Sequence, residues 1–148
     1  MTLNGLRLVV KPSVADYGVD TEMPVRVLLV NDGDHPVSVN DRFAVSSPGG
    51  PGELSFSIID PSGERLPFGA RINLGRAGPD DVATVAPGGF VATTVDLFDY
   101  FDMSEPGMYR ISAAYTSVRP EEDADDYSPL SGVWTGTVES DEMSIELR

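Results

Sequence analysis

The sequence contains no cysteine among its 148 residues. This absence excludes disulfide bonds, thiolate zinc sites and thiol nucleophiles together, and it is typical of a reducing compartment. The chain also lacks an apolar run close to the roughly 18 residues that a membrane-spanning helix needs. Its first residues show no secretory signal pattern. We therefore expect a cytoplasmic protein, and the length predicts one domain over residues 1–148.

Positive charge is scarce, because Lys and Arg number 10 against 24 Asp and Glu, for a formal net charge of −14. Lys11 is the only lysine. This balance repels phosphate backbones and anionic membrane surfaces, so we expect neither a nucleic-acid partner nor membrane binding. An acidic surface with little lysine is typical of salt-adapted proteins. A GC-rich genome, which favours arginine codons, is an equal alternative.

Long amphipathic helices are also missing from the pattern. Twelve prolines and fifteen glycines interrupt the chain about every ten residues, which is the rhythm of an all-β domain. Apolar residues alternate with polar ones, as Leu54, Phe56 and Ile58 do. A single antiparallel β-sandwich of seven to nine strands is the natural closure. The strands are expected within residues 6–10, 24–31, 37–45, 53–60, 85–97, 108–117 and 132–148.

Two local departures from alternation carry further predictions. In the last segment the alternation slips between Val138 and Met143, which predicts a bulge or bend. Around LFDYFDM (97–103) polar residues recur every three positions, which predicts one short helical turn capped by Asp96 or Asp99. Its expected inward side chains are Leu97, Phe98 and Phe101, with Tyr100 left near the surface.

The segment EPGMYRI (105–111) resembles a corner of immunoglobulin-like and fibronectin-like sandwiches. In that architecture a tyrosine follows a Gly-containing turn, and its hydroxyl bonds back to the corner backbone. The resemblance implies this role for Tyr109, with Ile111 as an inward core residue opposite Val27 or Leu29. The strand-C tryptophan of that pattern is missing, because Trp134, the only tryptophan, lies in the last expected strand.

Three segments resemble a more specific group: VRVLLVNDGDHPVSV, VAPGGFVATTVDL and YFDMSEPGMYRISAAY. They are similar to the N-terminal β-sandwich region that precedes the catalytic domain of deuterolysin-type metalloproteases, and to the small intracellular proteinase inhibitors of bacilli. The resemblance spans residues 24–147 and implies an accessory or inhibitory module. It does not imply protease activity, because a His-Glu-x-x-His zinc site needs two histidines and the chain has one.

Few residues point to catalysis. His35 lies in the turn sequence NDGDHP, where Asp32 or Asp34 could orient it as a general base or a metal ligand. The simpler interpretation is a solvated histidine at a hairpin tip. No Gly-x-Ser-x-Gly nucleophile motif accompanies it, so we expect no enzyme and no catalytic residue.

The segment RPEEDADDYSP (119–129) concentrates carboxylates. A calcium loop is one interpretation, since hard cations take several oxygen ligands from one segment. The spacing of an EF-hand loop is absent, however, so a solvated acidic loop is the alternative. No other cofactor is expected. The candidate metal ligands are Glu121, Glu122, Asp123, Asp125 and Asp126.

These features favour a non-enzymatic interaction or accessory module that binds a protein partner through loops or a sheet edge. The loops at 46–53 and 119–131 are the longest irregular segments. A proteinase-inhibitor-like domain and a carbohydrate-binding module are the alternatives, and a homo-oligomer formed through a sheet edge stays open. The candidate ligand or partner contacts are Tyr100, Tyr127, Trp134 and His35, with Tyr17 as a further aromatic platform for sugars.

Overall fold

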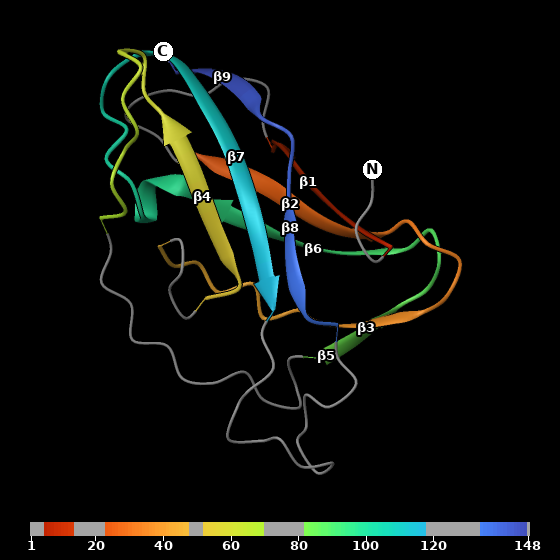
Figure 1. Cartoon of the computed structure of the whole chain (residues 1–148). Coiled ribbons are helices and arrows are strands. Elements are labelled where there is room, and N and C mark those ends of the chain that lie inside the picture. Colours follow the sequence, from red (N-terminus) through yellow and green to blue (C-terminus); the bar gives the residue numbers. More distant parts are fainter. Residues whose placement is uncertain (1–4, 14–22, 48–51, 70–81, 118–133, 148) are drawn as a thin grey trace.

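The computed structural model describes residues 5–13, 23–47, 52–69, 82–117 and 134–147 (Figure 1). These residues form nine strands and one 3₁₀ turn, η2 (Leu97–Asp99), and contain no α-helix. The strands are β1 (Leu6–Pro12), β2 (Pro24–Asn31), β3 (Val37–Asn40), β4 (Leu54–Ile59), β5 (Val82–Val85), β6 (Phe90–Asp96), β7 (Gly107–Ser117), β8 (Gly136–Glu139) and β9 (Met143–Leu147). The all-β prediction is confirmed.

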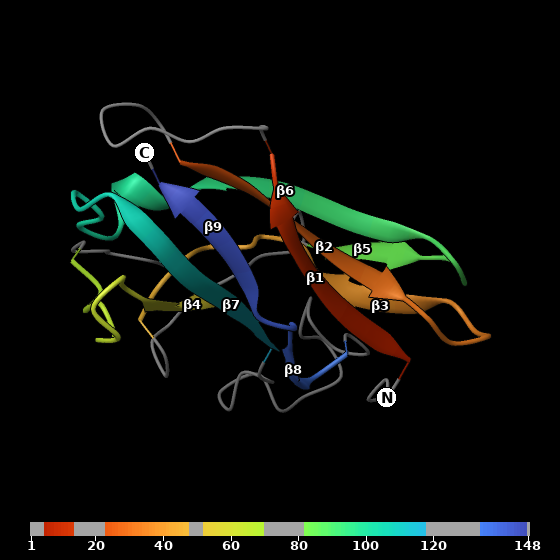
Figure 2. The ribbon, with the colours of Figure 1, turned by 90° about the horizontal axis from the view of Figure 1, so that it is seen from above.

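The strands form antiparallel sheets that pack against each other. One sheet has the order β1-β2-β6; another has the order β4-β7-β8, with β9 also paired to β7; β3 and β5 form a two-stranded ribbon. In Figure 1 the strands β4 and β7 cross in front of β2 and β6, and Figure 2 shows the two layers from above. The predicted sandwich is therefore confirmed.

The core lies between the two layers and follows from the alternation of the strands. On β2, Val25, Val27 and Leu29 are completely buried. On β7, the buried positions are Tyr109, Ile111, Ala113 and Tyr115, as the sequence predicts. Each fully buried side chain of this size contributes about 1.5–3 kcal/mol of hydrophobic stabilisation.

A buried asparagine fixes the corner where two strand pairs turn together. β2 leads into β3 and β5 leads into β6, so the pair β2/β6 continues as the pair β3/β5. At the corner the Asn31 amide donates to the carbonyls of His35 (2.7 Å) and Val85 (2.8 Å). Its Oδ1 accepts from the Gly33 N–H at 3.0 Å. The side chain therefore ties both turning chains together and leaves no unpaired buried amide.

The aromatic segment after β6, residues 97–103, forms the predicted helical turn, but the turn is shorter than expected. Asp96 is the N-cap of η2 and accepts from the Phe98 N–H at 3.0 Å and from the Met23 N–H at 2.9 Å. Leu97 and Phe101 are buried and Phe98 is partly buried against the core. The helical geometry itself covers only Leu97–Asp99, not 97–103.

Tyr109 forms the corner expected from EPGMYRI. Its hydroxyl donates to the Glu105 carbonyl at 2.6 Å, four residues earlier. Burial raises the pKa of this hydroxyl above its usual value, so it stays a donor. Two residues later Ile111 is completely buried. The corner thus closes the turn before β7 with one side chain.

Two strand boundaries differ from the sequence prediction. The strand expected over 37–45 ends at Asn40, because Phe43 adopts a left-handed backbone (φ 53°) that a continuous strand cannot accommodate. The last segment divides into β8 and β9, both paired with β7, so the predicted break after Val138 is confirmed. Trp134 precedes β8 and is not a strand residue, which corrects its expected place.

Candidate functional site

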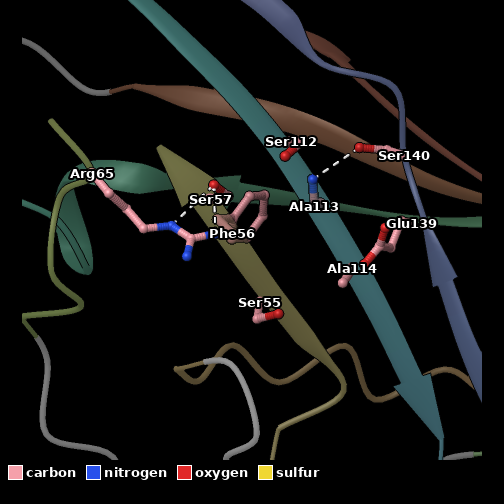
Figure 3. A pocket seen from close by; sticks show the side chains of 9 residues that line it. All are labelled: Ser55, Phe56, Ser57, Arg65, Ser112, Ala113, Ala114, Glu139 and Ser140. Carbon is pink, nitrogen blue, oxygen red and sulfur yellow. Dashed lines mark hydrogen bonds between the residues drawn. The ribbon is translucent and has the colours of Figure 1, made fainter. Parts of the chain in front are cut away.

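The outer face of the sheet formed by β4, β7 and β8 is hollowed where small side chains meet (Figure 3). The hollow has a volume of about 270 Å³. Ser55 and Ser57 of β4 pair across the sheet with Ala114 and Ser112 of β7, and all four point away from the core. Short side chains on a sheet face leave a shallow depression, so the sequence alternation itself produces this hollow.

One cation and one carboxylate flank the floor of the hollow. Arg65 donates through Nη2 to the Ser57 hydroxyl at 2.9 Å, and the Ser140 hydroxyl accepts from the Ala113 N–H at 2.9 Å. Glu139 lines the opposite side (Figure 3). The partner of Ser57 is a guanidinium, which cannot take a proton, so this serine is not activated as a nucleophile. The hollow can only offer hydrogen bonds.

The second candidate site is the free edge of β6. Gly89 and Leu97 lie just outside the two ends of β6, and both bond to the β2 side. The Asn31 N–H donates to the Gly89 carbonyl (2.9 Å), and the Leu97 N–H donates to the Met23 carbonyl (3.0 Å). Backbone groups alternate sides along an antiparallel strand. The N–H and C=O groups of Phe90, Ala92 and Thr94 therefore face away from β2, and no described strand pairs with them.

Burial and charge distinguish this edge. The core-facing Val91 and Thr93 are only half-buried, and Phe90 on the outer face is 53% exposed. Residues 82–95 are the longest stretch of the chain without Asp, Glu, Lys or Arg, although charged residues make up 23% of the sequence. β6 contains no proline either. From Phe90 to Val95 it therefore lacks the charges and prolines with which natural proteins protect edge strands, and its one charged residue is the terminal Asp96.

The outer edges of β1, β4, β8 and β9 carry such protection. β1 contains the exposed Arg7, Lys11 and Pro12. On the outer side of β4, bridges join Leu54 to Val45 and Ile59 to Arg65. β8 and β9 have four and five residues and carry exposed glutamates. Short length, charge and coverage all oppose pairing with another chain.

The outer face of the β1–β2–β6 sheet continues this edge. Its side chains form three rows across the strands. These three rows contain three cations and no carboxylate, in a chain of net charge −14, and the carboxylate of this face, Asp96, lies beyond them opposite Pro24. Leu28, in the middle row, is only 9% exposed. The rows are Arg7–Val30–Phe90, Val9–Leu28–Ala92 and Lys11–Arg26–Thr94.

A buried ion pair, which the sequence analysis did not identify, lies where the 46–53 loop begins and ends. Glu53 is 6% exposed and accepts from Arg42 through Nη2 (2.7 Å) and Nε (2.9 Å). It also accepts from the Ala44 N–H (3.0 Å) and the Asn40 amide (3.3 Å). Four donor groups on one carboxylate offset its desolvation. The pair joins residues eleven apart across a loop, and no sequence period marks such a contact.

The predicted histidine lies in the connection between β2 and β3, which is not the expected hairpin because β3 pairs with β5 and not with β2. His35 Nδ1 lies 2.6 Å from an Asp34 carboxylate oxygen, and the two side chains are 84% and 93% exposed. Asp32, the other predicted partner, instead lies 3.9 Å from Arg7 Nε. Solvent surrounds the His35–Asp34 pair, so the site provides no desolvated environment for acid–base chemistry.

Tyr100 packs on a residue that the sequence analysis did not single out. Its ring stacks on Phe68 with centroids 5.8 Å apart, and Phe68 in turn contacts Phe101 edge-on at 5.7 Å. Beside it, a second hollow of about 230 Å³ is lined by Phe98, Phe101, Asp102, Met103 and Ser104. Tyr100 does not line that hollow, so the aromatic segment acts mainly as packing at this end of the sandwich.

Trp134 is packed against the core and does not form an open aromatic platform. Its ring lies 5.9 Å from that of Tyr115, which in turn contacts Phe43 edge-on at 5.9 Å. Its indole Nε1 is the one buried side-chain nitrogen or oxygen among the described residues that lacks a hydrogen-bond partner. Tyr115 donates to the Asn40 carbonyl at 2.7 Å, and burial raises its pKa.

The remaining predicted residues lie outside the part of the chain that the structure describes. They are Tyr17, Tyr127 and the five acidic candidates Glu121, Glu122, Asp123, Asp125 and Asp126. Within the described ranges, no group of three or more His, Asp or Glu could hold a metal ion. No helix in those ranges is long and apolar enough to cross a membrane. No protein-family model matches this chain, and no curated protein matches it.

Proposed function

We propose that the protein is a non-enzymatic interaction module that binds an extended segment of a protein partner along β6. The observation that carries this proposal is the uncharged edge, on which the backbone groups of Phe90, Ala92 and Thr94 face away from β2. An extended peptide that adds a strand to such an edge gains main-chain hydrogen bonds from it.

The expected affinity of the bare edge is modest. Three residues with one N–H and one C=O each offer up to six hydrogen bonds, at about 0.5–1.5 kcal/mol apiece. Association opposes this with at least several kcal/mol of lost translational and rotational freedom. Backbone pairing alone therefore gives weak, transient binding, and side chains on the flanking faces must supply the rest.

The fold type supports an adhesion-like or accessory role. The Tyr109 hydroxyl bond to the Glu105 carbonyl, together with the buried Ile111 and Val27, matches the corner pattern of immunoglobulin-like sandwiches. We infer from this corner that the chain is of the immunoglobulin-like type. Such sandwiches present rigid strands and loops to partners.

The exposed state of His35 supports binding over catalysis. Its contact with Asp34 lies in solvent in the connection between β2 and β3, and Ser57 of the sheet hollow has a guanidinium as neighbour. Neither place combines a nucleophile with a base inside a desolvated pocket, which is the arrangement that covalent catalysis needs.

The variant Ala92→Pro tests the proposal, because it removes one outward N–H while leaving the bonds to β2 in place. Ala92→Ser is the matched control that keeps the N–H. We expect the proline variant to lose partner binding and the serine variant to retain it. Circular dichroism should show that both variants are folded and unfold in a thermal transition. Thr94→Glu, which adds a protecting charge, should weaken binding in the same way.

Native mass spectrometry separates the occupants of the edge. The proposal expects a monomer at micromolar concentration, because two copies of net charge −14 repel each other. A dimer of the wild type that Ala92→Pro converts to a monomer would instead identify a second copy as the occupant. Binding that is equal in all three variants would overturn the edge as the site.

A proteinase-inhibitor function is the second candidate, favoured by the clamped base of the 46–53 loop. The Ser46 N–H donates to Leu54 O (2.9 Å), the Leu54 N–H donates to Ala44 O (2.9 Å), and the Gly52 N–H donates to the Ser46 hydroxyl (3.0 Å). A loop held at both ends is the requirement for an inhibitory loop that resists cleavage. Inhibition assays on serine proteases and metalloproteases test it, and rapid cleavage within residues 46–53 without inhibition would reject it.

A further inference from the structure

The three rows on the outer face of the β1–β2–β6 sheet set the side chains that a strand bound to β6 would meet. A strand added beyond β6 continues each row by one residue, because paired antiparallel strands keep their rows in register. This inference therefore rests on the proposed function. Only the residues next to Phe90, Ala92 and Thr94 lie on this face, at alternate positions of the added strand.

Two of the rows are apolar where the added strand would lie. Phe90 is 53% exposed, so the residue beside it covers an aromatic face. Ala92 is short, and its row neighbour Leu28 is an apolar residue on the same face. A side chain beside Ala92 reaches over it towards Leu28. Both positions favour apolar partner residues, since burial yields about 25 cal/mol per Å².

The third row carries positive charge that no carboxylate among the described residues neutralises by an ion pair. Lys11 and Arg26 are directly opposite each other, which destabilises an antiparallel pair. Both are exposed, and no ion pair joins either of them to a carboxylate within the described ranges. Because Lys11 occupies the β1 side, charge repulsion favours an Arg26 side chain that extends towards β6.

Arg26 can reach the added strand across Thr94. Neighbouring strands are about 4.8 Å apart, so the added residue lies about 10 Å from Arg26 along the row. Thr94 is short and lies between them. The combined length of an extended arginine and a glutamate or aspartate side chain spans this gap. A carboxylate at this place would neutralise the like-charged pair.

We infer that the partner segment of this edge is an extended peptide with two alternating apolar residues followed or preceded, at the next alternate position, by an acidic residue. The apolar residues lie beside Phe90 and Ala92, and the carboxylate lies beside Thr94 and binds Arg26. A second copy of the chain does not meet this requirement. The single carboxylate of β6, Asp96, accepts from Met23 and Phe98 as the cap of η2.

A displayed library of random ten-residue peptides tests the inference, selected in parallel on four forms of the full chain. The forms are the wild type, Ala92→Pro, Arg26→Glu and Arg110→Glu. Arg110 is an exposed arginine on β7, 4.0 Å from Glu142, and its reversal changes the net charge by the same amount far from β6. Circular dichroism checks that each form is folded.

The wild type and Arg110→Glu should select the same peptides. These peptides should have apolar residues at two alternate positions and Asp or Glu at the next alternate position. Arg26→Glu should select Lys or Arg at the acidic position. Among single synthetic peptides, exchanging Glu for Lys there should weaken wild-type binding about tenfold and strengthen Arg26→Glu binding about tenfold, measured by fluorescence anisotropy.

The outcomes separate this inference from the proposed function. If the wild type selects no peptide, or Ala92→Pro selects the same peptides as the wild type, edge binding itself is overturned. If selection depends on the Ala92 N–H but shows no acidic preference, or Arg26→Glu leaves the preference unchanged, edge binding stands and the acidic partner is overturned. A shift of the preference in Arg110→Glu as well would attribute it to net charge and reject the role of Arg26.

Discussion

β1 and β6 are the two edge strands of one sheet, each seven residues long and each paired with β2. On β1 the core-facing Leu6 and Leu8 are 0% and 3% exposed, and the outer positions carry charge. On β6 the core-facing Val91 and Thr93 are half-buried, and the outer positions Phe90, Ala92 and Thr94 are uncharged. Two strands with the same neighbour and the same length therefore have opposite surface chemistry, and only one of them is suited to accept a further strand.

The largest expected effect comes from proline at neighbouring positions of β6. Thr93→Pro removes an N–H that faces β2 and should lower the free energy of unfolding by about 3 kcal/mol. Ala92→Pro removes an outward N–H and should lower it by less than about 1 kcal/mol. Urea denaturation measures both. Equal losses of unfolding free energy for the two variants would mean that the backbone of β6 is hydrogen-bonded on both sides. β6 would then not be an open edge that differs from β1.

A matched valine pair compares how well the core is closed beneath the two edges. Val10 of β1 is buried, whereas Val91 of β6 is half-buried. Val10→Ala should lower the free energy of unfolding by about 2 kcal/mol, and Val91→Ala by less than about 1 kcal/mol, because less apolar surface is lost. Thermal and urea unfolding of the two variants measure the difference. A larger loss of unfolding free energy for Val91→Ala than for Val10→Ala would mean that another segment covers β6.

Alkaline pH probes the well-closed part of the core, where Tyr115 lies. Burial raises the folded-state pKa of Tyr115 above its usual value of 10.0. Below pH 10 the tyrosine is neutral in both states and its contribution is fully present; above it, ionisation favours the unfolded chain and stability falls.

Tyr115→Phe should therefore cost about 1 kcal/mol at pH 7, where the hydroxyl bond to Asn40 is lost. Its stability should decline less steeply than that of the wild type as the pH rises above 10. Urea denaturation at a series of pH values tests this, and parallel curves for the two proteins would contradict the assignment.

The smallest expected effect concerns the charge on the outer face. Lys11→Glu turns the like-charged pair with Arg26 into an opposite pair across the strands. It should raise the free energy of unfolding by about 0.5 kcal/mol while weakening binding of an acidic peptide. Arg110→Glu is the control, since it removes an attraction to Glu142 and should not stabilise. A destabilised Lys11→Glu would show that Lys11 serves the fold and not a partner.

Alternation made the strands and much of the core predictable. Leu54, Phe56 and Ile58 on β4 are buried as their spacing indicates. The Asp96 cap and the Tyr109 corner were also predictable, because each depends on residues within a few positions of each other. Contacts between residues that are close in the sequence can be predicted from the sequence alone.

The features that depend on which strands meet could not be predicted. The open edge of β6 follows from the order β1-β2-β6, and the Arg42–Glu53 pair follows from how the chain between β3 and β4 folds back; no local spacing encodes either of them. The strand expected to reach Val45 failed at Phe43, because a bulky residue gives no sequence sign of a left-handed backbone. The acidic segment at 121–126 stays a prediction, since it lies outside the described residues.

The Asn31 corner limits the length of the strand that can pair with β6. Its amide fixes the turn at one end of the strand, where the chain leaves the sheet direction, and η2 ends the strand at the other. Seven residues at about 3.4 Å each give a straight track of about 24 Å. A segment longer than this must bend away at both ends, so the protein would measure the length of the strand it accepts as well as its sequence.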